Sequence, residues 1–93
     1  MVKHVVMWRF ADEKDIEIAR DALENMKGRV SAVRSLEVGR DFLRSGASFD
    51  LVLITEHEDR EKLEAYQADP LHGEVKKILG GLKSDRVVVD FEI

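Results

Sequence analysis

Residues 2–10 read VKHVVMWRF, a run rich in β-branched and aromatic residues with the two-residue period of a strand. Alternate positions share a face, and one face carries His4, Val6, Trp8 and Phe10. The other face carries Val5 and Met7. Because both faces are apolar, this strand needs cover on two sides, and that requirement directs the interpretation of the rest of the chain.

An amphipathic helix is predicted directly after this strand. Asp12 can cap its first amides, and Gly28 can end it in a left-handed conformation. Between them, apolar residues recur at helical spacing, namely Ile16, Ala19, Ala22, Leu23 and Met26. A hairpin is then predicted, with strands over 33–42 and 49–56 joined by a Ser45–Ser48 turn. In its first strand one face carries Leu36, Val38, Arg40 and Phe42.

A broken helix and a last strand complete the chain. Asp59 can cap a helix that carries Leu63 and Tyr66, while Pro70 disfavours helical geometry at the residue before it. Asp69 is therefore predicted to cap a new helical face made by Leu71, Val75, Ile78 and Leu79. Gly80 and Gly81 are predicted to end this helix, and residues 87–91, VVVDF, to form the last strand.

The order βαββαβ predicts one α+β domain over residues 1–93, with a ferredoxin-like, four-stranded antiparallel sheet. Both helices then cover one face of the sheet. The bare face would carry either Val6, Trp8 and Phe10 or the side chains on the other side of the strand. Either set makes an apolar area that a second copy could cover. We therefore expect a homodimer, an eight-stranded dimeric α+β barrel with a cavity between its two sheets.

Composition excludes several classes of function. The net charge is −4, with 15 basic against 19 acidic residues, so nucleic acid is not an expected partner. The chain has no cysteine, which rules out disulfides, thiolate metal clusters and a thiol nucleophile. Neither a signal peptide nor a membrane-spanning segment is recognisable, so we expect a cytoplasmic protein without a membrane partner.

Three stretches resemble the stress-responsive A/B barrel (Dabb) family: KHVVMWRF, VGRDF, and FDLVLITEHEDREKLEAYQADPLH over residues 49–72. The resemblance covers nearly the whole chain, and its most specific parts are His4 and the Tyr-x-x-x-Pro-x-His segment of Tyr66, Pro70 and His72. It implies a compact homodimer. Plant polyketide cyclases of this family use the residue corresponding to His72 as a general base beside the one corresponding to Tyr66, without a cofactor. They carry histidine where this chain has Asp50 and Asp69.

His72 and Tyr66 are the first candidate catalytic residues. His72 lies in the first turn of the helix capped by Asp69, where the helix dipole disfavours imidazolium and keeps a neutral ring. Beside a phenol in an apolar cavity, it would serve as base and Tyr66 as oxyanion donor for enolisation of a carbonyl compound. The alternative is that the two side chains hold the helix break together by a hydrogen bond.

His4 and Asp50 form a second candidate pair. The first and third strands are expected to be parallel neighbours, so these residues would start them side by side and could hydrogen-bond. The carboxylate could then orient a catalytic imidazole. The alternative is a polar pair that fixes the dimer register. A metal held by His4, Asp50 and His72 is not expected, because no paired-histidine spacing supports it, and no cofactor is expected.

Four residues are candidates for lining a ligand cavity: Trp8, Val6, Arg40 and Phe42. Aromatic side chains there could stack on an apolar or aromatic ligand, although at a two-residue period they are commonly core or interface residues. Arg40 could bind an acidic ligand or pair with a carboxylate in the dimer. His57 is expected to face solvent, and we assign it no role.

Three functions remain open. The first is a homodimeric Dabb-type protein whose cavity binds a small apolar ligand, with its activity undetermined. The second is a cofactor-independent enzyme, either polyketide-cyclase-like or, by analogy of fold, quinol-monooxygenase-like. The third is a structural oligomer with a filled barrel.

Overall fold

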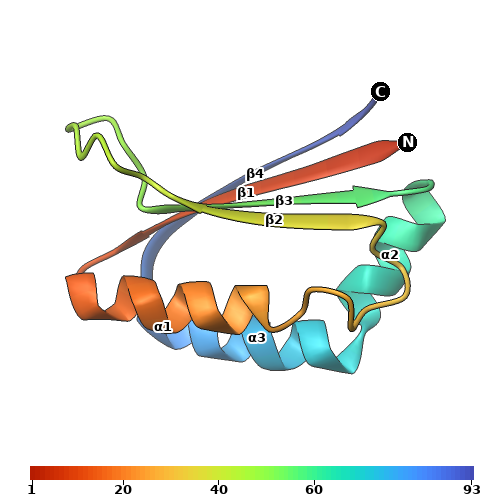
Figure 1. The fold of residues 1–93 in the computed structure, drawn as a ribbon, viewed down its shortest axis with the longest axis horizontal. Coiled ribbons are helices and arrows are strands. Elements are labelled where there is room, and N and C mark those ends of the chain that lie inside the picture. The colour runs from red at the N-terminus through yellow and green to blue at the C-terminus, as the bar shows by residue number, and fades with distance from the viewer.

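The chain forms four strands and three helices, as a computed structural model that describes all residues, 1–93, shows (Figure 1). In order they are β1 (Val2–Phe10), α1 (Glu13–Glu24), β2 (Ser35–Arg40), β3 (Leu51–His57), α2 (Arg60–Ala68), α3 (Pro70–Leu82) and β4 (Lys83–Glu92). This is the predicted ferredoxin-like order with the second helix in two pieces. None of the helices combines the length and the apolar character needed to cross a membrane.

Aspartates begin all three helices, as the sequence predicts. The Asp12 carboxylate accepts a hydrogen bond from the Lys14 amide at 3.0 Å, and Asp59 and Asp69 make equivalent bonds at the starts of α2 and α3. Gly28 has the expected left-handed φ of 75°, but the prediction that it ends the first helix is wrong, because α1 ends at Glu24 with Asn25 as its cap. The predicted end of α3 at Gly80 and Gly81 is two residues early, because neither glycine adopts a positive φ and the helix continues to Leu82.

The sheet has the strand order β2-β3-β1-β4, and every neighbouring pair is antiparallel. The expectation that β1 and β3 are parallel is therefore wrong. The hairpin reverses β3 relative to β2, so β3 runs against β1 as well. In the resulting register Leu51 lies opposite Trp8, and Thr55 lies opposite His4.

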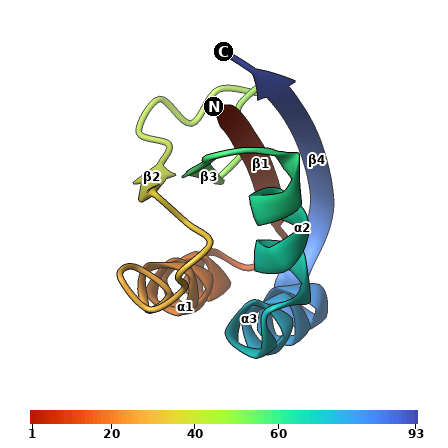
Figure 2. The same cartoon turned by 90° about the vertical axis from the view of Figure 1, so that its right-hand side faces the viewer.

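The helices cover one face of the sheet, here called the inner face, with α1 and α3 side by side beneath it and α2 at one end (Figures 1 and 2). Trp8 is only 5% exposed and packs with Val6 and Leu53 in the core between sheet and helices. The face of β1 that holds Val6, Trp8 and Phe10 is thus the covered one, and the bare face is its opposite.

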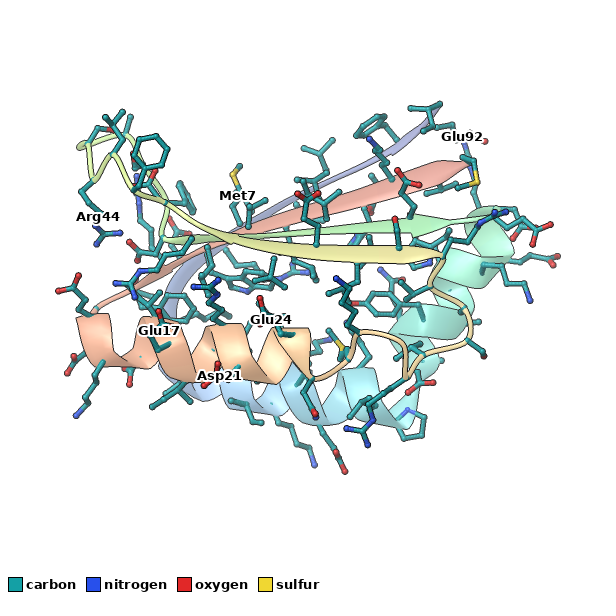
Figure 3. All side chains as sticks on the ribbon, viewed as in Figure 1. Met7, Glu17, Asp21, Glu24, Arg44 and Glu92 are labelled. Carbon is teal, nitrogen blue, oxygen red and sulfur yellow. The ribbon has the colours of Figure 1, made fainter.

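The opposite, outer face of the sheet is uncovered and mainly apolar, with the Lys3–Glu56 ion pair near one end. Figure 3 shows Met7 projecting from β1 on the side away from the helices. By strand alternation and register the outer face carries Val5, Met7, Val52, Ile54, Val87, Val89 and Phe91. Val89 is 61% exposed. This surface fits the expected pairing with a second copy.

Candidate functional site

A pocket of about 440 Å³ lies on the inner side of the sheet, between the strands and the helices of one protomer. The cavity expected from the sequence lay between the sheets of two protomers, a different place. The lining residues are His4, Val6, Trp8, Leu23, Met26, Leu53, Tyr66, Gln67, His72, Val75, Lys76, Leu79, Gly80, Lys83 and Arg86. Most of this lining is apolar, so the polar groups within it stand out.

The only tyrosine of the chain lies among all three of its histidines. The ring of Tyr66, on α2, has its centroid 4.4 Å from that of His72 on α3. His57, at the end of β3, and His4, on β1, follow at 5.1 and 5.9 Å. The break between α2 and α3 brings Tyr66 and His72 to the same point, which is why six residues of separation place them in contact.

Two buried polar atoms in this cluster have no hydrogen-bond partner: the Tyr66 hydroxyl and His72 Nδ1. Tyr66 is 0% exposed. The alternative that these side chains hold the helix break by bonding each other is therefore wrong. The break is stabilised by Asp69, whose carboxylate accepts from the Leu71 amide at 2.8 Å. A buried group without a partner costs free energy, so such groups commonly serve a ligand or a reaction.

Burial sets the protonation of both groups. It lowers the pKa of His72 below its ordinary value, assisted by the positive charges of His4, Lys76 and Arg86, while the Gln67 carbonyl opposes the change without making a well-aligned hydrogen bond. Burial also raises the pKa of Tyr66 to about 12, against the influence of Arg86. At neutral pH the pocket thus presents a neutral imidazole beside a protonated phenol, an acceptor beside a donor.

His4 pairs with Asp90 of β4 rather than with Asp50. The two residues face each other in the β1–β4 register, and His4 Nδ1–H donates to the Asp90 carboxylate. This bond fixes the ring, so Nε2 is the nitrogen left for the pocket that His4 lines. The predicted pair of His4 with Asp50 is therefore wrong, because the carboxylate that orients His4 comes from β4.

Asp50 lies at the other end of β1, because β3 runs antiparallel to it. Its carboxylate accepts from the Phe10 amide and from the Arg44 guanidinium, both at 2.8 Å. It does not line the pocket. The hypothetical metal trio of His4, Asp50 and His72 therefore does not assemble.

His57 is fully buried, and the expectation that it faces solvent is wrong. Its Nδ1–H donates to the Ala32 carbonyl at 2.9 Å, and its Nε2 lies 2.8 Å from the Thr55 hydroxyl. Burial lowers its pKa, so the neutral ring accepts from Thr55. With both nitrogens occupied, His57 supports Tyr66 by packing and tethers the end of β3 to the loop before β2.

The four residues predicted to line a ligand cavity separate into two pairs. Val6 and Trp8 line the pocket. Arg40 instead pairs with Glu17 and Glu13 of α1, at 2.7 and 3.3 Å, which places its ion pair within the protomer. Phe42 is 90% exposed in the connection after β2, because the strand ends at Arg40 rather than at residue 42 as predicted.

Several residues of the site were not identified from the sequence, among them Asp90, which holds His4 without lining the pocket. Asp90 had a usable signal, since it is an acid within an apolar strand and antiparallel pairing of β1 with β4 places it across from His4. No signal in the sequence marked the other polar residues of the pocket, because a polar residue on a helix or edge strand resembles any other solvated residue. These residues are Gln67, Lys76, Lys83 and Arg86.

The fold and the pocket define a class of protein: a ferredoxin-like protomer with an apolar pocket under its sheet and a histidine–tyrosine pair inside it. The family model of the stress responsive A/B barrel domain (Dabb) matches residues 2–93. The chain therefore belongs to this family.

Three proteins are similar to this chain, the first of which carries the same domain name while the other two share its fold. A stress-response A/B barrel domain-containing protein of Arabidopsis thaliana is 26% identical over 96 residues, 98% of this chain and 85% of the relative. A dimeric ferredoxin-like protein of unknown function from Bacteroides fragilis is 26% identical, with a TM-score of 0.84 over 99% of this chain and 95% of the other. A dimeric ferredoxin-like protein of unknown function from Thermobifida fusca shares the fold at 21% identity, with a TM-score of 0.88 over 99% and 90%.

Proposed function

We propose that this protein is a cofactor-independent acid–base catalyst that enolises a small, mainly apolar carbonyl compound. The observation that carries the proposal is the pair of buried atoms without partners, the Tyr66 hydroxyl and His72 Nδ1, at the same pocket. One is a hydrogen-bond donor and the other a proton acceptor. Enolisation needs this combination, because charge develops on the carbonyl oxygen while a proton leaves the neighbouring carbon.

In the proposed step His72 Nδ1 takes a proton from the carbon next to the carbonyl. The electron pair of the broken C–H bond forms the carbon–carbon double bond of the enolate, and the oxygen that gains charge accepts the hydrogen bond of Tyr66. The imidazolium then returns the proton to carbon, or the enolate carbon attacks a second carbonyl of the same molecule, whose oxygen takes up the proton from the imidazolium. The second outcome is a ring closure of the kind that the resemblance to plant polyketide cyclases implies.

The neutral state of His72 supports the role of base. Burial already lowers its pKa, so the ring is free to accept a proton at neutral pH. His4, held by Asp90, acts as a positioning residue whose ring lies 5.9 Å from that of Tyr66. We favour proton transfer over a quinol-monooxygenase-like oxidation as the function, because the two unpartnered groups are a base and a hydrogen-bond donor.

We also infer that the working form is a homodimer joined through the outer face of the sheet. That face carries exposed apolar side chains on β1 and β4, including Met7, Val89 and Phe91. Exposed apolar surface of this kind favours association. The two similar solved proteins described above are dimeric, in agreement with this inference.

Proton exchange tests the enzyme proposal. In D₂O, the protein should accelerate deuterium incorporation at the carbons beside the carbonyl of 4-phenyl-2-butanone, followed by NMR. His72→Ala should reduce the rate to that of buffer, and Tyr66→Phe should lower it strongly. Phe42→Ala is the matched control, since this exposed ring lies outside the pocket, and it should exchange like the unchanged protein. Exchange no faster than buffer, or unaltered by His72→Ala, would overturn the proposal.

A further inference from the structure

Three cationic side chains line the solvent-exposed part of the pocket: Lys76 on α3, and Lys83 and Arg86 on β4. We call them the cationic rim. No aspartate or glutamate lines the pocket. Acidic residues outnumber basic ones in the whole chain, 19 against 15, so the composition does not account for a pocket lined by cations alone.

The fold directs these side chains toward the reacting pair. Arg86 lies opposite Trp8 in the β1–β4 register, so both project from the inner face of the sheet. Lys76 follows His72 by four residues on α3 and so shares its helix face. Their positive charges reach the pair, since both lower the pKa of His72 and Arg86 also lowers that of Tyr66.

The rim has no carboxylate partner, whereas seven of the other twelve cations of the chain are ion-paired. Arg40 pairs with Glu13 and Glu17, and Arg60 pairs with Glu92. No ion pair is formed by any rim side chain. The nearest acid in sequence, Asp85, is engaged elsewhere, by the Arg9 guanidinium and by the backbone amide of Arg86.

Unpaired cations beside an apolar pocket are suited to an anionic ligand. They attract it, and partial exclusion of water strengthens the attraction once it is bound. The arrangement is costly without an anion, because like charges gathered near the half-buried His72 repel one another and its protonated form.

We propose that the rim binds a carboxylate of the substrate, so that the protein acts on a carbonyl-containing organic acid. The carboxylate would lie at the rim and the apolar part in the pocket, with the carbonyl at Tyr66 and His72. This inference rests on the proposed function, because it uses the same pocket and names the class of its substrate.

Binding can be measured without turnover. Trp8 is the only tryptophan and lines the pocket, so its fluorescence reports ligand binding. The probes are 4-(3-oxobutyl)benzoate and its neutral primary amide, which differ in charge and little in shape. The full-length protein should bind the benzoate at least about tenfold more tightly than the amide, and this ratio should shrink as salt screens the rim.

Rim variants locate the effect. Arg86→Gln, and the double variant Lys76→Gln with Lys83→Gln, should each bring the ratio of the two affinities toward one. Lys77→Gln is the matched control, because this exposed lysine neighbours Lys76 on α3 but does not line the pocket. It should leave the ratio unchanged. Equal affinities in the unchanged protein, or a ratio that rim variants do not alter, would overturn the inference.

Deuterium exchange on the same two probes separates this inference from the proposed function. If the protein exchanges deuterium into the amide faster than buffer does, but binds the benzoate no more tightly than the amide, the enolisation proposal is supported and the anion site is refuted. If neither probe exchanges while benzoate is preferred through the rim, the anion site stands and the enolisation proposal fails.

Discussion

Removing the hydroxyl of Tyr66 should make the folded protein more stable and less active. The hydroxyl is buried without a hydrogen-bond partner, whereas in the unfolded chain water satisfies it. Folding therefore carries the desolvation cost of this group with no compensating bond. Tyr66→Phe removes that cost and keeps the ring contacts with His72 and His57. If the hydroxyl only stabilised the fold, its removal would instead lower the free energy of unfolding.

The magnitude follows from the cost of an unsatisfied buried group, about 1–3 kcal/mol. We expect the low end, an increase of about 1 kcal/mol in the free energy of unfolding, because the buried group is a single neutral hydroxyl rather than a charge. For a domain of this length that corresponds to a rise in Tm of about 4–8 °C. Urea and thermal unfolding measure it, at equal protomer concentration because dimerisation contributes to apparent stability.

Thr55→Val is the matched control, a removal of one buried hydroxyl that does have a partner. Thr55 lies 2.8 Å from His57 Nε2, and the substitution leaves that nitrogen unsatisfied. The free energy of unfolding of Thr55→Val should be about 1–3 kcal/mol lower than that of the unchanged protein. The reasoning is refuted if Tyr66→Phe destabilises the protein as Thr55→Val does, since the hydroxyl would then have a stabilising partner in solution.

Two further predictions concern protonation and assembly. Because the pKa of His72 lies below the ordinary 6.5, kcat/KM for exchange should hold steady from alkaline to neutral pH and fall only with a midpoint below 6.5; a midpoint at or above that value contradicts a buried base. Val89→Asp puts an unpaired charge on the outer face and should give a monomer by light scattering, while Ile18→Asp on the exposed side of α1 should keep the dimer. A dimer that survives Val89→Asp would place the interface elsewhere.

The fold was predictable because its signals are local. Aspartates at positions 12, 59 and 69 cap the three helices, and Pro70 breaks the second helix where the sequence indicates. Both faces of β1 are apolar, which required cover on two sides. Periodicity alone left open which face meets the helices, because both satisfy the pattern, and only packing places Trp8 inside and Met7 outside.

The site was predictable where its residues are close in sequence. Tyr66 and His72 flank the helix break, so local geometry brings them together. Partners distant in sequence depend on strand direction, and a wrong direction for β3 placed Asp50 beside His4 instead of at the far end of β1. His57 looked exposed for a related reason: Thr55 lies only two residues before it on β3, but the Ala32 carbonyl that buries its other nitrogen comes from the loop before β2, which only the tertiary fold brings close.

Strand β4 connects the pocket to the dimer interface. All of its residues are exposed in the protomer, and it pairs only with β1. On its inner side, Arg86 belongs to the cationic rim and Asp90 accepts the hydrogen bond of His4. Its outer positions, such as Val89, carry apolar side chains. A partner that covers the outer positions would hold the edge strand in place and with it the pocket wall. Dimer formation and ligand binding should therefore stabilise each other, although each protomer contains a complete site.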